Sequence, residues 1–79
     1  MTQPSDAIIY DYTGLKCPLP VLKTRRALSD LAAGAIITII ADDPAAPLDF
    51  IHFCETSGHT LLESQDKEGQ FHFIIQKQG

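Results

Sequence analysis

Hydrophobic and polar residues alternate in short segments along the chain, and their pattern predicts four strands. Ala7–Tyr12 is rich in β-branched and aromatic side chains, which is typical of a first strand. Ala35–Ala41 is a nearly continuous apolar run, as expected of a strand in the interior of a sheet. Two further strands are predicted at Thr60–Gln65 and Gln70–Lys77, joined as a hairpin through the turn-forming residues Asp66–Gly69.

Two helices are predicted between these strands. The first runs from Pro18 to Ala33 with Gly34 as its stop, and the second runs from Pro47 to Gly58. The resulting order is β-α-β-α-β-β, and right-handed crossovers place both helices on one face of a four-stranded mixed sheet. The predicted fold class is therefore α+β, in the form of a two-layer α/β sandwich.

Length and composition limit the chain to one small domain. Its 79 residues are 44% hydrophobic, which suffices for a core but leaves no room for a large substrate cleft. We expect residues 1–6 to be a flexible N-terminus and residues 7–79 to form the single domain. The longest apolar run, Leu31–Ala41, is too short to span a membrane, and the N-terminus has no signal-peptide pattern. The expected location is the cytoplasm, with no membrane contact.

Charge is distributed unevenly along the sequence. The formal net charge is −4, which argues against direct, extensive binding of nucleic acid. Four of the six Lys and Arg residues nevertheless fall within residues 16–26, whereas residues 27–66 contain seven acids and neither Lys nor Arg. The chain thus carries one short basic segment, which begins beside Cys17.

Cys17 is the strongest candidate for chemistry. Pro18 and Pro20 are tolerated in the first turn of a helix, so Pro18 is expected at the first helical position and Cys17 at the N-cap. There the sulfur could accept a hydrogen bond from the Leu19 N–H and interact favourably with the positive end of the helix dipole. The neighbouring Lys16 would further favour the thiolate. The alternative is that Cys17 is merely a small residue at a tight junction. Because cysteine is a poor N-cap, we favour a reactive thiol.

The first helix is predicted to have one buried and one exposed face. Its sheet-facing residues are expected to be Pro20, Val21, Thr24, Ala27, Leu28, Leu31 and Ala32. Leu19, Leu22, Lys23 and Arg26 fall together on the other side, one turn from the thiol. This combination indicates a docking surface for an acidic partner, although an ordinary solvated helix with two stray leucines is the alternative.

The second cysteine has a different environment. Cys54 is expected in the core, on the arc that Pro47, Phe50 and Ile51 form, so no disulfide is predicted. No spacing among the cysteines and histidines matches a zinc pattern. We therefore expect neither a metal nor a cofactor, and we expect the histidines (His52, His59 and His72) at the surface or at a rim.

Asp42 and Asp43 follow the second predicted strand. If the first two strands are parallel, these aspartates lie at the same edge of the sheet as Cys17. They are expected to act as turn and capping residues. The alternative is that one of them tunes the thiol or helps to protonate a sulfur species.

Several motifs together resemble one known family. They are Gly14-Leu15-Lys16-Cys17-Pro18-Leu19-Pro20, then Ala41-Asp42-Asp43-Pro44-Ala45, then Asp49 with Phe53-Cys54, and then Gly58-His59. In these motifs and in its last strand the chain resembles the TusA/SirA family of sulfur-carrier proteins, over nearly everything from Asp11 to Lys77. The resemblance implies the two-layer sandwich, and it implies that Cys17 carries sulfane sulfur as a persulfide.

The resemblance also implies the kind of partner. A cysteine desulfurase or a rhodanese-type donor would load Cys17, and a DsrE-like or other acceptor protein would receive the sulfur. Family pathways include tRNA thiolation, molybdenum-cofactor maturation and sulfur oxidation. Leu19 stands where members of the tRNA-thiolation subgroup often have an acidic residue, and Leu48 where they frequently have a basic one. The pathway therefore stays open.

Three functions are compatible with these residues. The favoured one is a monomeric sulfurtransferase that acts as a sulfur carrier. In it Cys17 holds the sulfur, and the supporting residues are Lys16, Pro18, Pro20, Asp42 and Asp43. A second is a non-catalytic interaction or regulatory module of the same fold. A third is a thiol redox protein, which would form a disulfide instead of a persulfide.

Overall fold

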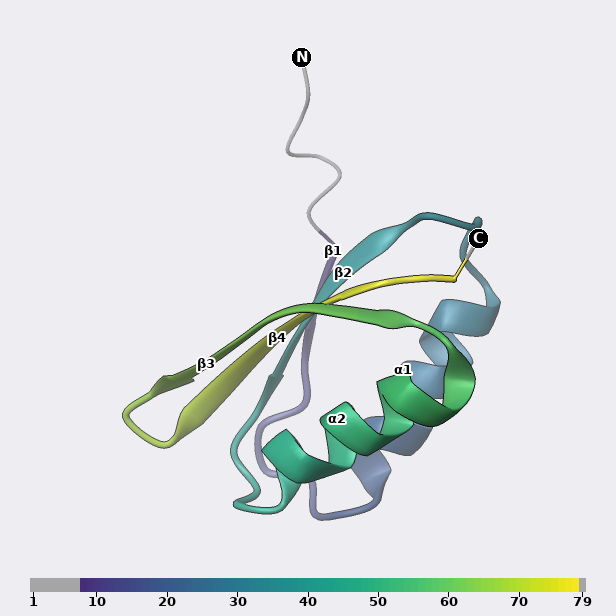
Figure 1. Cartoon of the computed structure of the whole chain (residues 1–79). Helices are drawn as coiled ribbons and strands as arrows, with labels where there is room; N and C mark the ends of the chain where they lie inside the picture. The colour runs from purple at the N-terminus through teal and green to yellow at the C-terminus, as the bar shows by residue number, and fades with distance from the viewer. Residues whose placement is uncertain (1–7, 79) are drawn as a thin grey trace.

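The computed structural model describes residues 8–78 and shows two helices packed on one side of a single sheet (Figure 1). The elements are β1 (Ile8–Asp11), α1 (Leu19–Ser29), β2 (Ile36–Ala41), α2 (Ala46–Ser57), β3 (Thr60–Lys67) and β4 (Gln70–Gln76). The strand order is β1-β2-β4-β3; β1 and β2 are parallel, and the other neighbours are antiparallel. The predicted α+β sandwich with the order β-α-β-α-β-β is confirmed.

The core forms between the helices and the two central strands. In β2 the buried residues Ile37, Ile39 and Ala41 alternate with more exposed ones, as expected of a strand with one covered face. The neighbouring strand β4 contributes Phe73, which is fully buried. Phe50 of α2 stacks on Phe73 with ring centroids 4.6 Å apart. This contact fixes α2, and therefore its first turn, relative to the sheet.

The first helix is shorter than predicted, because it ends at Ser29 and not at Ala33. The N–H of Leu31 donates to the carbonyl of Leu28, and the N–H of Ala35 donates to the carbonyl of Ala32, so the chain continues in tight turns. The Lys77 ammonium donates to the Leu31 carbonyl at 2.5 Å. In a continued helix this carbonyl would instead accept a backbone hydrogen bond from the next turn. One consequence is that Ala32, predicted to face the sheet, is exposed.

The second helix agrees more closely with its prediction. It occupies Ala46–Ser57, and Gly58 follows it with a φ of 87°, the left-handed conformation that ends many helices. The prediction that Ile51 shares the buried face of α2 with Cys54 is wrong, because Ile51 is 41% exposed. Phe53 is buried on this helix in its place. Cys54 itself is buried, as predicted.

The remaining strand boundaries differ by a few residues. The hairpin turn contains only Glu68 and Gly69, both with positive φ, so β3 extends through Lys67 instead of ending at Gln65. The predicted residue Ala7 of the first strand and the predicted flexible N-terminus, residues 1–6, lie outside the described part of the chain. Between residues 8 and 78, the structure contains no helix with the length and apolarity that a membrane crossing requires.

Candidate functional site

Cys17 lies in the loop that leads from β1 into α1, with its side chain exposed. Two aspartates that follow the parallel strand β2 bind this loop. Asp42 Oδ1 accepts from the Gly14 N–H at 3.0 Å, and Asp43 Oδ2 accepts from the Cys17 N–H at 2.5 Å. The structure therefore brings Asp42 and Asp43 together with Cys17 at the carboxyl edge of the sheet, where the sequence placed them.

The start of α1 differs from its prediction. The N-cap residue is Pro18, not Cys17, and no side chain caps this end. The N–H of Leu19 donates to the Lys16 carbonyl at 2.8 Å, and the first helical bond runs from the Leu22 N–H to the Pro18 carbonyl. Because the Leu19 amide is used in this turn, it cannot stabilise a Cys17 thiolate. The prediction that Cys17 caps the helix is wrong for this reason.

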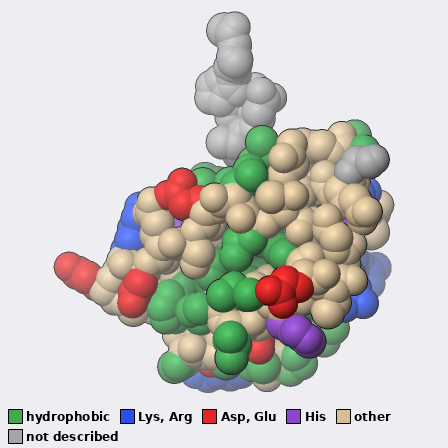
Figure 2. Space-filling view, in the orientation of Figure 1, with side chains coloured by type: hydrophobic (Ala, Val, Ile, Leu, Met, Phe, Trp, Pro, Cys, Tyr) green, Lys and Arg blue, Asp and Glu red, His purple; other side chains and the backbone are tan. Residues whose placement is uncertain are grey.

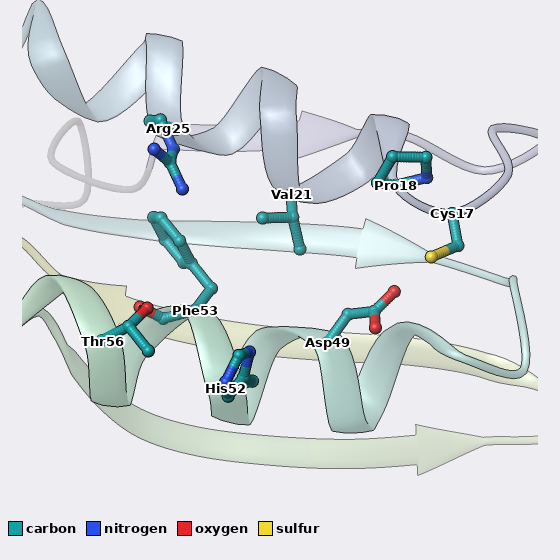
Figure 3. Close-up of a pocket in the computed structure, with 8 residues that line it drawn as sticks. All are labelled: Cys17, Pro18, Val21, Arg25, Asp49, His52, Phe53 and Thr56. Atoms are coloured by element: carbon teal, nitrogen blue, oxygen red, sulfur yellow. The ribbon is translucent and has the colours of Figure 1, made fainter.

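The electrostatic surroundings of the thiol are acidic. Asp49, in the first turn of α2, points toward the Cys17 sulfur (Figure 3). The hydrogen bond to the Asp49 carboxylate raises the pKa of the Cys17 thiol, and desolvation and the charges of Asp49 and Asp43 act in the same direction. The predicted low-pKa thiolate is therefore wrong for the isolated protein. Backbone hydrogen bonds from Ala45 and Cys17 lower the pKa of Asp43, and the ammonium of Lys16 acts in the same direction.

A cleft of about 240 Å³ opens beside the sulfur, between α1 and α2. Its lining residues are Cys17, Pro18, Val21, Arg25, Asp49, His52, Phe53 and Thr56 (Figure 3). The Arg25 guanidinium lies 5.7 Å from the centre of the Phe53 ring, at the end of the cleft away from the cysteine. A cleft of this size admits a side chain or a short peptide segment. It does not enclose a substrate.

The outer side of α1 is exposed as predicted. Leu19 is 44% exposed and Leu22 50%, and Lys23 and Arg26 are also exposed. In α2, Leu48 is 72% exposed and directly precedes Asp49. Hydrophobic side chains also gather on the face that Figure 2 shows, beside α2 and the β3–β4 hairpin. Both helices therefore expose apolar side chains near the sheet edge at which Cys17 lies.

Cys54, His59 and His72 lie outside the cleft beside Cys17, whereas His52 is part of it. Cys54 is 5% exposed, and burial raises the pKa of its thiol. His52 lines the cleft, His59 Nδ1 accepts from the Gln78 N–H at 2.9 Å, and His72 is half-buried in β4. Residues 8–78 contain no group of three or more His, Cys, Asp or Glu side chains gathered closely enough to hold a metal ion.

Of the residues that line the cleft, only Cys17 and Pro18 were predicted from the sequence as part of a site. Three of the others can carry charge: Asp49, Arg25 and His52. A signal for Asp49 was present, because it lies in the first turn of a helix that begins at the same sheet edge as Cys17. The crossing of α1 over α2, which only the packed structure defines, brings the other two into the cleft.

The comparisons with known proteins agree with this arrangement. A family model described as Sulfurtransferase TusA matches residues 8–77, which is most of the chain. The chain belongs to the TusA family. This finding confirms the resemblance that the sequence motifs indicated.

Relatives within the TusA family extend over nearly the whole chain. A protein named sulfur carrier protein TusA, from Pseudomonas paraeruginosa, is 43% identical over 77 residues, which cover 98% of this chain and 96% of the relative. A protein of the same name from Allochromatium vinosum is 40% identical over 67 residues, covering 85% of this chain and 88% of the relative. These similarities support a role as a sulfur carrier, which takes sulfur from a donor and gives it to an acceptor.

A solved structure supports the fold independently. The crystal structure of a SirA-like protein from Desulfitobacterium hafniense superposes with a TM-score of 0.80 at 27% sequence identity. The match covers 91% of this chain and 99% of that structure. The TusA-family fold is therefore shared over the sheet and both helices.

Proposed function

We propose that Cys17 is the residue of this sulfur carrier that holds the transferred sulfur, as a persulfide. The observation that carries the proposal is the contrast between the two thiols: Cys17 is exposed at the mouth of a cleft, whereas Cys54 is buried in the core. A carrier needs one accessible thiol and no nearby second thiol that would form a disulfide with it. Cys17 meets both conditions among the described residues.

Loading is a transfer of one sulfur atom between cysteines. The Cys17 sulfur, deprotonated during the encounter, attacks the outer sulfur of a donor persulfide. A bond forms between Cys17 Sγ and this outer sulfur, the donor's own S–S bond breaks, and the donor cysteine leaves as a thiolate that takes up a proton. Unloading repeats the step with an acceptor cysteine as the attacking group, so Cys17 is regenerated without net oxidation. In this sense the protein is a sulfurtransferase.

The supporting residues keep the Cys17 backbone in place during these encounters. Asp43 holds the Cys17 N–H, Asp42 holds the Gly14 N–H, and Pro18 and Pro20 stiffen the start of α1. The main chain is therefore fixed while the sulfur stays open to a partner. Such preorganisation favours transfer between two bulky proteins.

The exposed side of α1 is the proposed docking surface, formed by Leu19, Leu22, Lys23 and Arg26. Its cations favour an acidic partner surface and its leucines provide apolar contact. The proposed donors are a cysteine desulfurase or a rhodanese-type protein, and the proposed acceptor is a DsrE-like or related protein. All are proteins expected in the cytoplasm, where thiols stay reduced.

Mass spectrometry of the intact protein tests the proposal. The protein is incubated with a cysteine desulfurase and cysteine, and separately with a rhodanese and thiosulfate, and its mass is recorded without reductant. We expect a gain of at least one sulfur atom that dithiothreitol removes. Cys17→Ser should show no gain, whereas the matched variant Cys54→Ala should load normally. Failure with both donors on the folded protein would overturn the proposal and favour an interaction module instead.

A further inference from the structure

The reacting edge and the docking surface of this protein carry opposite charges. The charged groups that act on the Cys17 sulfur are both acidic: Asp49 from the first turn of α2, and Asp43 from the loop before it. The nearest cation in sequence, Lys16, acts on Asp43 and is not among the groups that shift the pKa of the Cys17 thiol. By contrast, Lys23 and Arg26 make the exposed side of α1 basic.

We infer that the partner segment that reacts at Cys17 brings a cationic side chain beside its own cysteine, and that this cation pairs with Asp49. The inference rests on the proposed function, because it names the chemistry of the partner at the same site. Asp49 is a positioning residue in this account, since it acts through the Cys17 thiol and not on the transferred sulfur.

The geometry gives Asp49 two opposite effects. In the free protein its carboxylate faces the sulfur across the mouth of the cleft (Figure 3) and disfavours ionisation of the thiol. An anion at this position, whether thiolate or persulfide, would lie against a second negative charge. A cation that pairs with the carboxylate removes the repulsion, so the reactive anion forms when the partner is in place.

Room for such a cation is available at the same position. Asp49 is half-buried and lines the 240 Å³ cleft together with Cys17 and the apolar side chains of Pro18 and Val21. The other cleft residues that carry or can take up positive charge, Arg25 and His52, lie further from the sulfur, along the helices (Figure 3). Arg25 is engaged with the Phe53 ring. The cleft therefore offers an incoming cation one carboxylate beside the thiol and an apolar wall for the stem of its side chain.

Small disulfides that differ only in charge can test this inference without any sulfur donor. The probes are cystamine (cationic), bis(2-hydroxyethyl) disulfide (neutral) and dithiodipropionate (anionic). In each reaction the Cys17 thiolate attacks one sulfur of the probe, a mixed disulfide forms, and the other half leaves as a thiolate that takes up a proton. The proton that Cys17 loses goes to solvent. Rates are measured by intact mass on the full chain.

For the wild-type protein we expect cystamine to react faster than the neutral probe, and the anionic probe to react most slowly. In Asp49→Asn the ratio of cationic to neutral rates should fall about three- to five-fold, the size expected of one charge at contact distance near the surface. Alkylation by neutral iodoacetamide should reach its half-maximal rate at a lower pH in the same variant, because the repelling charge is gone. Glu55→Gln removes one charge on the same helix and should leave both quantities unchanged.

The inference would be overturned if the ratio of cationic to neutral rates were equal in wild type and Asp49→Asn. It would also be overturned if this ratio fell as much in Glu55→Gln as in Asp49→Asn. Should Asp49→Asn fail to fold, the wild-type protein still gives a decisive test. Added salt should slow cystamine relative to the neutral probe, and an unchanged ratio would overturn the inference. If Cys17 is loaded with persulfide sulfur but the disulfide probes show no charge preference, only this inference is refuted and the proposed function stays intact.

Discussion

The backbone N–H of Cys17 donates to the carboxylate of Asp43, which lies 26 positions later in the chain. The other oxygen of the same carboxylate accepts from the Ala45 N–H at 2.9 Å, just before α2 begins. One side chain thereby connects the loop that enters α1 with the turn that enters α2. The position of Cys17 thus depends on a contact between two segments that are distant in sequence.

Replacement of this carboxylate should affect both stability and transfer. Asp43→Ala removes two backbone contacts, whereas Asp42→Ala removes only the one to Gly14. We therefore expect a larger fall in thermal midpoint and a slower rate of sulfur loading in Asp43→Ala than in Asp42→Ala. Thermal melting and the intact-mass loading assay measure the two effects. Equal effects of the two substitutions would contradict this account of Asp43.

The same residue predicts a pH dependence of stability. Backbone hydrogen bonds from Ala45 and Cys17 lower the pKa of Asp43 below its ordinary value of 3.8. A carboxyl with a lowered pKa contributes stability that is fully present above its unfolded pKa and is lost as the pH falls through its folded pKa. The difference in thermal midpoint between wild type and Asp43→Asn should be constant above about pH 5 and should shrink below about pH 4. A difference that grows on acidification would have the wrong sign.

The aromatic pair in the core allows a quantitative test of the fold. Phe50 and Phe73 are fully buried and stacked, so Phe50→Ala leaves a cavity that the sheet cannot fill. We expect a loss of about 3–5 kcal/mol in the free energy of unfolding, measured by urea titration. Leu48→Ala, on the same helix but 72% exposed, should change it by less than about 0.5 kcal/mol. Similar losses in both variants would contradict the assigned orientation of α2.

The α1 surface predicts an electrostatic contribution to partner binding. Arg26→Glu reverses an exposed charge of the proposed docking surface, so association with an acidic donor should slow by about ten-fold at low salt and less at high salt. Lys67→Glu, in the β3–β4 hairpin, makes the same change elsewhere and should have little effect. Surface plasmon resonance against the donor measures both. Iodoacetamide reactivity of Cys17 should be the same in the two variants, which separates docking from thiol chemistry.

The sequence was sufficient to predict those features that depend on local patterns. The apolar run of β2 and the stop at Gly58 follow from residue type alone, and the parallel pairing of β1 and β2 follows from the helix between them. That pairing also placed Asp42 and Asp43 near Cys17.

The features that the sequence did not predict depend on tertiary contacts. The early end of α1 involves a hydrogen bond from Lys77, at the far end of the chain, to Leu31. The acidity of Cys17 depends on Asp49, whose approach requires the packing of α2 against the sheet through Phe50. Helix-end electrostatics predicted a lowered pKa, but Cys17 does not cap α1, and the hydrogen bond to the Asp49 carboxylate raises the pKa of its thiol.

The far end of α2 has a consequence for attaching other groups to this protein. The last described residues pack there: a Cβ on Gly58 would lie 2.7 Å from the Gln78 side chain, and the Gln78 N–H donates to His59. Nine residues separate Gly58 from Asp49 along α2, a distance of about 13 Å at 1.5 Å per residue, and Cys17 lies beside Asp49. A fluorophore or a second domain joined beyond Gln78 by a short flexible linker would therefore leave the thiol free to meet its partners.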